Sequence, residues 1–346
     1  MTLILILLSM MSSVALAGSL PESPPSIWNP GSYGVSATSE LFTSNANYGE
    51  ERGSYSKLEE GHSITVFETR PRARYAFTHA ISAFAGTSFA QTKAVDSDTE
   101  KTSANLTEVY GGFDWQLNRR WWRVVPEFEF SYPVTATDPD QTVPLTSDGV
   151  WFMRAGVFLF KPYKRIRFES YLGLHYPGEG LAKRFNYSLA SEVALIRGFS
   201  IGGGVYGYET IVSDDKTQAE RTRTTDRANA GSQRFWAYDP ALLEARAWVG
   251  FRADRAFTFR LGYGKTINGV RTAEGSSVLL SIAFSSPGDK SRGRAIRAGH
   301  TVEDEEIIEP EVEAPREEFE TEPEVVDPEL FDQQQRKTKS KLEDRQ

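Results

Sequence analysis

Apolar and polar side chains alternate along most of the chain, and residues 150–176 show the pattern most clearly. Within this stretch, Phe168 and Leu172 alternate with charged residues such as Arg167 and Glu169. Because successive side chains of a β-strand point to opposite faces, a period of two predicts a strand with one apolar and one charged face. The stretch therefore predicts two amphipathic strands joined by a tight turn, and most of the chain repeats this plan.

Twelve segments have this alternation, which makes the expected class all-β. They are residues 33–43, 63–77, 81–95, 105–117, 121–135, 149–160, 165–177, 183–196, 199–212, 241–253, 256–267 and 275–285. Most are near or somewhat above the length of about ten residues that a tilted membrane strand needs.

The connections between the predicted strands alternate between short and mostly longer. The short ones are 78–80, 118–120, 161–164, 197–198 and 253–255, and the others are 44–62, 96–104, 136–148, 178–182, 213–240 and 268–274. This alternation is typical of a closed antiparallel transmembrane β-barrel, with tight turns in the periplasm and long loops outside. The even number of strands predicts that both termini lie on the periplasmic side. A soluble sandwich would instead mix loop lengths and contain Greek-key crossovers.

Charged residues occupy the strand face opposite the apolar one, which predicts a wet lumen, because a soluble core would not hold so many charges. The predicted pore-lining residues are Arg70, Arg72, Arg74, Glu108, Asp114, Glu127, Glu129, Arg154, Arg167, Glu169, Glu192, Glu244, Arg246 and Arg260. One hypothesis is a narrow pore or channel in which arginines guide small anionic or mixed-charge solutes. The other is a lumen closed by its own salt bridges, since twelve strands fall between a filled barrel and an open channel.

The last predicted strand, Gly275 to Phe284, ends in an aromatic residue. In this respect residues 31–286 resemble bacterial outer-membrane β-barrel proteins, whose final strand typically ends in Phe. The resemblance is one of architecture and names no specific family. It implies the outer membrane of a Gram-negative bacterium, with lipid, lipopolysaccharide and the barrel-assembly machinery as partners. Phe284 is not the last residue, so the assembly signal would be read from inside the chain.

The two ends of the chain differ from the barrel in composition. Residues 1–17 contain an apolar run and end in Ala-Leu-Ala, which predicts a secretory signal peptide, and residues 18–30 are a Pro-rich lead-in. Residues 287–346 predict a disordered periplasmic tail, in which residues 303–332 contain fifteen acidic residues and one basic residue. Such a tail could bind a periplasmic or envelope complex, which gives the alternative function of a structural outer-membrane anchor.

The sequence offers little for catalysis or cofactors. It contains no cysteine and four histidines far apart in the chain, so we expect no metal site and no cofactor. Nucleic acid is not an expected partner. His175, near the outer rim, is the one candidate for an outer-membrane hydrolase, but the expected class is not an enzyme.

Two further motifs have plain structural interpretations. Residues 202–207 satisfy G-x-G-x-x-G, but they fall inside a strand pattern with no helix after them, which argues against a dinucleotide loop. Loop 213–240 is expected to be a mobile surface loop. Its arginines could also fold inward as a constriction or contact lipopolysaccharide phosphates: Arg221, Arg223, Arg227 and Arg234.

Overall fold

The structure, a computed structural model, describes residues 29–286 except 98, 119–121, 139, 197 and 254–255. The predicted signal peptide, most of the lead-in and the acidic tail lie outside the described residues.

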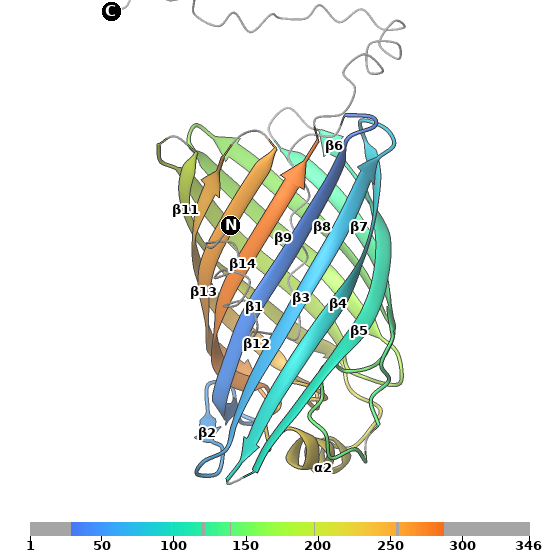
Figure 1. The fold of residues 1–346 in the computed structure, drawn as a ribbon, viewed down its shortest axis with the longest axis vertical. Coiled ribbons are helices and arrows are strands. Elements are labelled where there is room, and N and C mark those ends of the chain that lie inside the picture. The colour runs from blue at the N-terminus through green and yellow to red at the C-terminus, as the bar shows by residue number, and fades with distance from the viewer. Residues whose placement is uncertain are drawn as a thin grey trace, which may run out of the picture. The chain divides into compact units, whose positions relative to one another are not determined.

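Twelve long antiparallel strands form one closed barrel (Figure 1). They are β1 (Tyr33–Tyr48), β3 (Ser63–Ala76), β4 (Ile81–Asp96), β5 (Thr99–Trp115), β7 (Arg123–Pro133), β8 (Phe152–Tyr163), β9 (Ile166–Pro177), β10 (Lys183–Ala194), β11 (Phe199–Val212), β12 (Ala241–Arg252), β13 (Phe257–Val270) and β14 (Ala273–Ser285). Each pairs with its neighbour in the chain, and β14 pairs with β1 to close the wall. Two short strands, β2 (Tyr55–Lys57) and β6 (Leu117–Asn118), pair with β1 and β7. The predicted fold class and strand count are confirmed for the described residues.

The alternation of faces is also as predicted. On β9, Leu172 and Leu174 are about half exposed on the outer face, whereas the neighbouring Tyr171 is 1% exposed. On β7, Phe130 is exposed and Glu129 is buried. The barrel therefore presents apolar side chains outward and encloses charged ones.

Two predicted loops are wrong, because strands continue through them. β4 and β5 extend to Asp96 and Thr99, which pair with each other, so segment 96–104 is mostly strand. β13 and β14 likewise leave only residues 271–272 between them, where 268–274 was predicted as a loop. These strand ends are polar, which hid them from a pattern based on apolar alternation, but antiparallel backbone hydrogen bonds do not need apolar side chains.

Loop 213–240 contains a helix that the all-β prediction missed, α2 (Gln218–Ala228). Its N-cap Thr217 accepts from the backbone N–H of Glu220, and the Glu220 side chain accepts from the backbone N–H of Thr217. This capping box is written in the sequence as Thr followed three residues later by Glu. Within the part of the chain that the structure describes, no helix is long and apolar enough to cross a membrane.

Candidate pore lining and its cap

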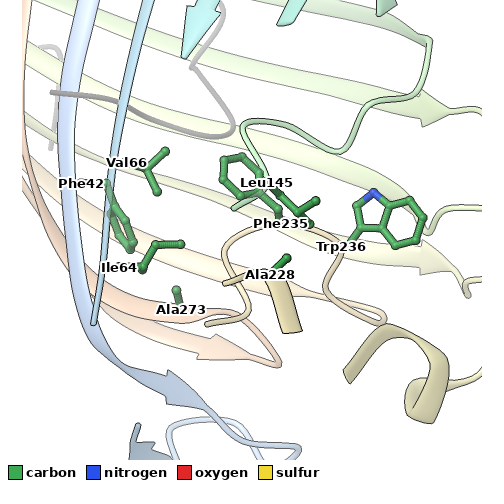
Figure 2. Packing of buried hydrophobic residues seen from close by; sticks show 8 residues of the cluster. All are labelled: Phe42, Ile64, Val66, Leu145, Ala228, Phe235, Trp236 and Ala273. Atoms are coloured by element: carbon green, nitrogen blue, oxygen red, sulfur yellow. The ribbon is translucent and has the colours of Figure 1, made fainter. Parts of the chain in front are cut away.

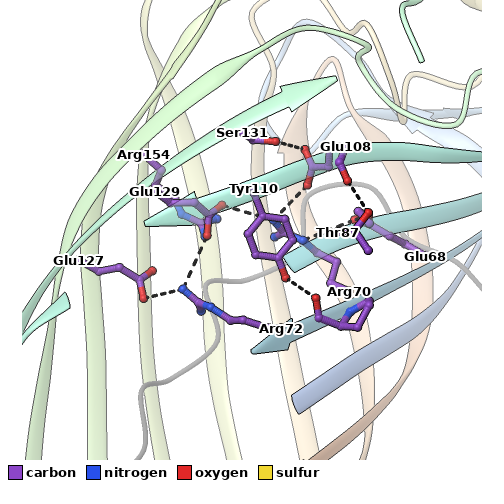
Figure 3. A network of polar contacts seen from close by, with 12 residues as sticks. Glu68, Arg70, Arg72, Thr87, Glu108, Tyr110, Glu127, Glu129, Ser131 and Arg154 are labelled. Carbon is purple, nitrogen blue, oxygen red and sulfur yellow. Dashed lines mark hydrogen bonds and ion pairs between the residues drawn. The ribbon is translucent and has the colours of Figure 1, made fainter. Parts of the chain in front are cut away.

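The arginine ladder of β3, which consists of Arg70, Arg72 and Arg74, lies inside the barrel and contacts carboxylates on β5 and β7 (Figure 3). Arg72 lies 3.0 Å from Glu127 of β7. Arg74 lies 3.0 Å from Asp114 of β5. All four side chains are almost fully buried. The ladder therefore lies along the wall, held by charges two and three strands away.

Aromatic rings on β4 and β5 support the arginines between their ion-pair partners. The guanidinium carbon of Arg72 lies 3.4 Å from the centre of the Phe84 ring, and that of Arg70 lies 4.2 Å from the centre of the Tyr110 ring. Glycine makes room for one of the rings, since a Cβ at residue 112 would lie 2.6 Å from the Phe84 ring. The flat rings and small residues leave space for the long arginine side chains to extend along the inner surface of the wall.

Glu129 of β7 connects the arginine ladder of β3 to Arg154 of β8. Its carboxylate oxygens lie 3.3 Å from Arg70, 3.8 Å from Arg72 and 2.7 Å from Arg154 of β8. Arg70 also lies 3.0 Å from Glu108, whose other oxygen accepts from Ser131. One buried carboxylate thus contacts three guanidinium groups, and together with Glu108 and Glu127 it forms a continuous network from β3 to β8.

A second charged group lies on the strands beside the β1–β14 seam. Arg246 of β12 lies 3.2 Å from Glu40 of β1 and 2.9 Å from Glu244 on its own strand. Ser277 of β14 donates to Glu244. Glu40 therefore also faces the lumen, where it is buried beside the seam.

A third charged group is more open. Arg167 and Arg260 contact Glu192 at 3.4 and 2.8 Å, and the two arginine side chains are 30% and 28% exposed. Glu169 lies 3.8 Å from Arg167. This group lies toward the end of the barrel that carries the short turns, called here the turn end.

Apolar residues also face inward, which the sequence analysis missed. Val125, Phe158, Phe160 and Tyr171 form a buried cluster on β7, β8 and β9. Gly156 and Gly173 flank the Tyr171 ring so closely that a Cβ at either would lie 2.3 Å from its hydroxyl oxygen. Glycines at inward strand positions indicate that a large side chain fills the space beside them, and this was the sequence signal for the buried cluster. The lumen is therefore only partly polar.

Two folded loops pack against the wall at the other end of the barrel. We call residues 134–151 and 213–240 together the cap. Leu145, Ala228, Phe235 and Trp236 of the cap pack with inward residues of the wall in one apolar cluster (Figure 2). The wall contributes Phe42, Ile64, Val66 and Ala273. The expectation of a mobile surface loop at 213–240 is therefore wrong, because its apolar residues are buried against the barrel.

Polar contacts fix the cap as firmly as the apolar ones. Asp148 accepts from the backbone N–H of Trp236 at 2.8 Å, and its other carboxylate oxygen lies 3.5 Å from Arg184 of β10. Asn47 of β1 donates to the carbonyl of Gly231 and accepts from the N–H of Gln233. The cap is thus tied to strands on both sides of the barrel.

The helix of the cap has its own buried ion pair. Asp214 accepts two hydrogen bonds from Arg221, at 2.9 and 2.8 Å, and both side chains are buried. At its N-terminus, hydrogen bonds from Thr217 hold the pKa of Glu220 below its usual value. Both features stabilise α2 as part of the cap.

The arginines of loop 213–240 have different fates. Arg221 is inside the cap, Arg227 contacts Asp140 on its surface at 2.9 Å, and Arg223 is exposed. Arg234 enters the barrel, where its guanidinium carbon lies 3.9 Å from the centre of the Phe42 ring. Of the four arginines, Arg234 thus points into the lumen, as the hypothesis of an inward-folding loop predicts.

A cavity of about 120 Å³ remains between the cap and the charged network. Its lining includes Glu68, Arg70, Glu108, Asp148, Arg154, His175, Arg184, Tyr206, Tyr208 and Arg234. Most of these side chains are charged or carry a polar group, and they come from six strands and both cap loops. All fourteen predicted pore-lining residues lie on barrel strands at inward positions, but only Arg70, Glu108 and Arg154 of them border this cavity.

His175 faces the lumen between two arginines. It pairs across the sheet with Arg154 and Arg184, and its ring centre lies 4.7 Å from that of Phe152. Ser170 lines a depression on the outer surface of the wall, so the two side chains are on opposite faces of β9. No described hydroxyl forms a hydrogen bond with His175, so the geometry brings no nucleophile to it.

The glycine motif of residues 202–207 lies within β11, as the strand pattern predicted. A Cβ at Gly202 would lie 2.4 Å from the Trp248 ring. Glycine is present there because an aromatic side chain of the adjacent strand occupies the space.

Comparison with known proteins identifies the fold. No family model and no curated protein sequence matches the chain. An outer-membrane channel from Pseudomonas putida F1 matches with a TM-score of 0.53 at 10% identity, over 77% of this chain and 100% of that one. The NanC porin matches with a TM-score of 0.42 at 10% identity, over 71% and 98% of the two chains. LpxR from Salmonella typhimurium, an enzyme, matches with a TM-score of 0.41 at 11% identity, over 73% and 99%.

The protein is therefore a closed twelve-stranded β-barrel with the fold of a bacterial outer-membrane channel. This confirms the architectural resemblance seen in the sequence. At such low sequence identity the similarity establishes the fold alone. The identity of any transported solute has to be inferred from the residues that line the lumen.

Proposed function

We propose that the protein is a narrow channel for small anionic or mixed-charge solutes, and that the structure is its closed form. The observation that carries the proposal is the cavity beneath the cap, which is lined by charged and polar groups inside a closed wall. A barrel that served only as a scaffold would gain more stability from an apolar filling at this place.

The charge of the lumen favours mixed-charge solutes over simple anions. Among the fourteen inward residues, guanidinium groups and carboxylates are equal in number. All three arginines of the ladder contact a carboxylate, so the ladder is not an uncompensated positive track. A solute that carries both charges can exchange with these ion pairs without adding net charge to the lumen.

Planar-bilayer conductance of the purified full chain tests the proposal. Replacing Phe235 and Trp236 together by Ala removes apolar contacts that hold the cap, so the variant should conduct more than the wild type. The lipid-facing change Tyr132→Ala is the control and should leave the current unchanged. The proposal fails if neither the wild type nor the cap variant carries current at any voltage that the bilayer withstands.

A structural anchor is the second candidate, supported by the continuous ion-pair network and by the acidic composition of residues 303–332. In this function the barrel holds the protein in the membrane and the tail binds a periplasmic or envelope complex. Envelope cross-linking of the full chain and of a chain ending at residue 286 would discriminate, since only the full chain should be captured with a defined partner. Equal patterns for both chains would remove the anchor from consideration.

A further inference from the structure

The charges around the cavity are divided between two sides. Glu68 of β3 and Glu108 of β5 contribute carboxylates on one side. Arg154, His175 and Arg184 lie on three consecutive strands on the other side, where His175 pairs in register with both arginines. Arg70 lies 3.0 Å from Glu108 on the first side, and Asp148 lies 3.5 Å from Arg184 on the second. Carboxylates therefore outnumber guanidinium groups among the lining residues of the first side, and cationic groups outnumber carboxylates on the second.

Three guanidinium groups at the cavity have unused hydrogen-bond donors. The Nε–H groups of Arg154, Arg184 and Arg234 are buried and have no acceptor among the described residues. The hydrogen bond from Arg184 to Asp148 is 3.5 Å long, at the limit of such an interaction. Buried donors without acceptors are unfavourable, and a carboxylate is the acceptor that suits the planar guanidinium group best.

The existing charge balance excludes a simple anion as the best ligand. Arg154 and Arg184 already have carboxylate partners in Glu129 and Asp148. The positive charge of Arg234 acts on both Glu40 and Glu68. A bare anion would add negative charge near carboxylates that are already compensated, whereas a ligand with its own cationic group would not.

We propose that the cavity binds a small zwitterion of the α-amino acid type. Its carboxylate accepts from Arg184 and Arg234, and its ammonium group lies toward Glu68 and Glu108. A water molecule takes up about 30 Å³ in the liquid, so the cavity of about 120 Å³ has room for a solute of a few heavy atoms. The inference rests on the proposed channel function for its physiological meaning, because it names the class of solute that the channel would carry.

Isothermal titration calorimetry of the full chain in detergent micelles tests the binding with three probes of similar size. Glycine carries both charges, acetate only the negative one and methylammonium only the positive one. We expect glycine to bind at least about tenfold more tightly than either of the others, which corresponds to one additional hydrogen bond to a charged group. Acetate binding as tightly as glycine, or no glycine binding, would overturn the inference.

Substitutions assign the two sides of the cavity. Arg184→Gln should weaken glycine binding by about tenfold or more, with Arg184→Lys intermediate because it keeps the charge but loses the planar donors. Glu68→Gln should remove the preference for glycine over acetate. The control Arg52→Gln changes an exposed arginine outside the lumen and should leave binding unchanged.

Heat-dependent mobility in gels shows whether each variant is a folded barrel. Folded Arg184→Gln and Glu68→Gln proteins that bind glycine like the wild type would refute the site. Because binding is measured without a bilayer, a silent conductance trace with normal glycine binding would count against the channel alone. Conductance without glycine binding would count against the zwitterion alone.

Discussion

At the scale of single residues, the decisive feature is a buried carboxylate that serves several arginines. Glu129 is 1% exposed and has three guanidinium groups within 4 Å. An ion pair of this kind adds little net stability compared with apolar packing, but removing one partner leaves charges buried without compensation. Glu209 and Arg52 form a pair of similar length, 2.7 Å, whose side chains are 34% and 54% exposed. The two sites differ in solvent access and in the number of guanidinium groups that the carboxylate contacts.

Glu129→Gln should therefore lower the free energy of unfolding by about 3 to 5 kcal/mol. The matched change Glu209→Gln should cost less than about 1 kcal/mol, because water screens the exposed pair. Urea unfolding of both variants in lipid vesicles, followed by tryptophan fluorescence, gives the comparison. Equal losses for the two variants would show that burial does not control the strength of these pairs.

At the scale of elements, the cap behaves as a folded part of the barrel. α2 is too short to be stable by itself, since isolated helices of fewer than about 12 residues are marginal in water. Its stability comes from the buried pair between Asp214 and Arg221 and from Ala228 in the apolar cluster. A change that removes the buried pair should loosen the whole helix, whereas a change in a surface pair should not.

Asp214→Asn should therefore expose the cap to trypsin, which cleaves after arginine residues such as Arg223 and Arg227 when the helix opens locally. The control Asp140→Asn breaks the exposed pair with Arg227, whose carboxylate partner is 81% exposed, and should leave cleavage near the wild-type rate. Trypsin digestion of proteoliposomes over time, read by mass spectrometry, measures both. The helix would not depend on its buried pair if the two variants were cleaved alike.

At the scale of the whole molecule, pairing between the first and last strands closes the wall, as Figure 1 shows for β1 and β14. Closure is required because an open edge in hydrocarbon would leave backbone N–H and C=O groups unpaired. In the register of the seam, Ser39 lies opposite Leu280. The chain contains no cysteine, so an introduced pair reports this contact alone.

The double variant with Ser39→Cys and Leu280→Cys should form a disulfide, since directly opposed residues have Cα atoms about 4.5–5.5 Å apart, within the range that a disulfide spans. The offset pair Ser39→Cys with Ile282→Cys should not, because that diagonal distance is about 7–8 Å. A faster-migrating band in non-reducing gels would report the bond. Bond formation only in the offset pair would mean that the seam has a different register.

The sequence by itself determined the wall of this protein. An alternation of apolar and polar residues depends only on the period of the strand, so residues such as Phe130 and Glu129 could be assigned to opposite faces without coordinates. The same local rule predicted twelve strands, their antiparallel order and the inward charges. It missed the strand ends near Asp96 and Thr99 because those residues are polar on both faces.

Only the tertiary structure decided what the lumen contains. Which carboxylate meets Arg72, whether Arg234 enters the barrel and where the cavity remains all depend on residues far apart in the chain. Loop 213–240 is polar in sequence, yet Phe235 and Trp236 bury its end against Phe42 and Val66. Such contacts form because closure of the barrel places both loops of the cap at the same end. The local alternation of apolar and polar residues carries no information about contacts between segments so far apart in the chain.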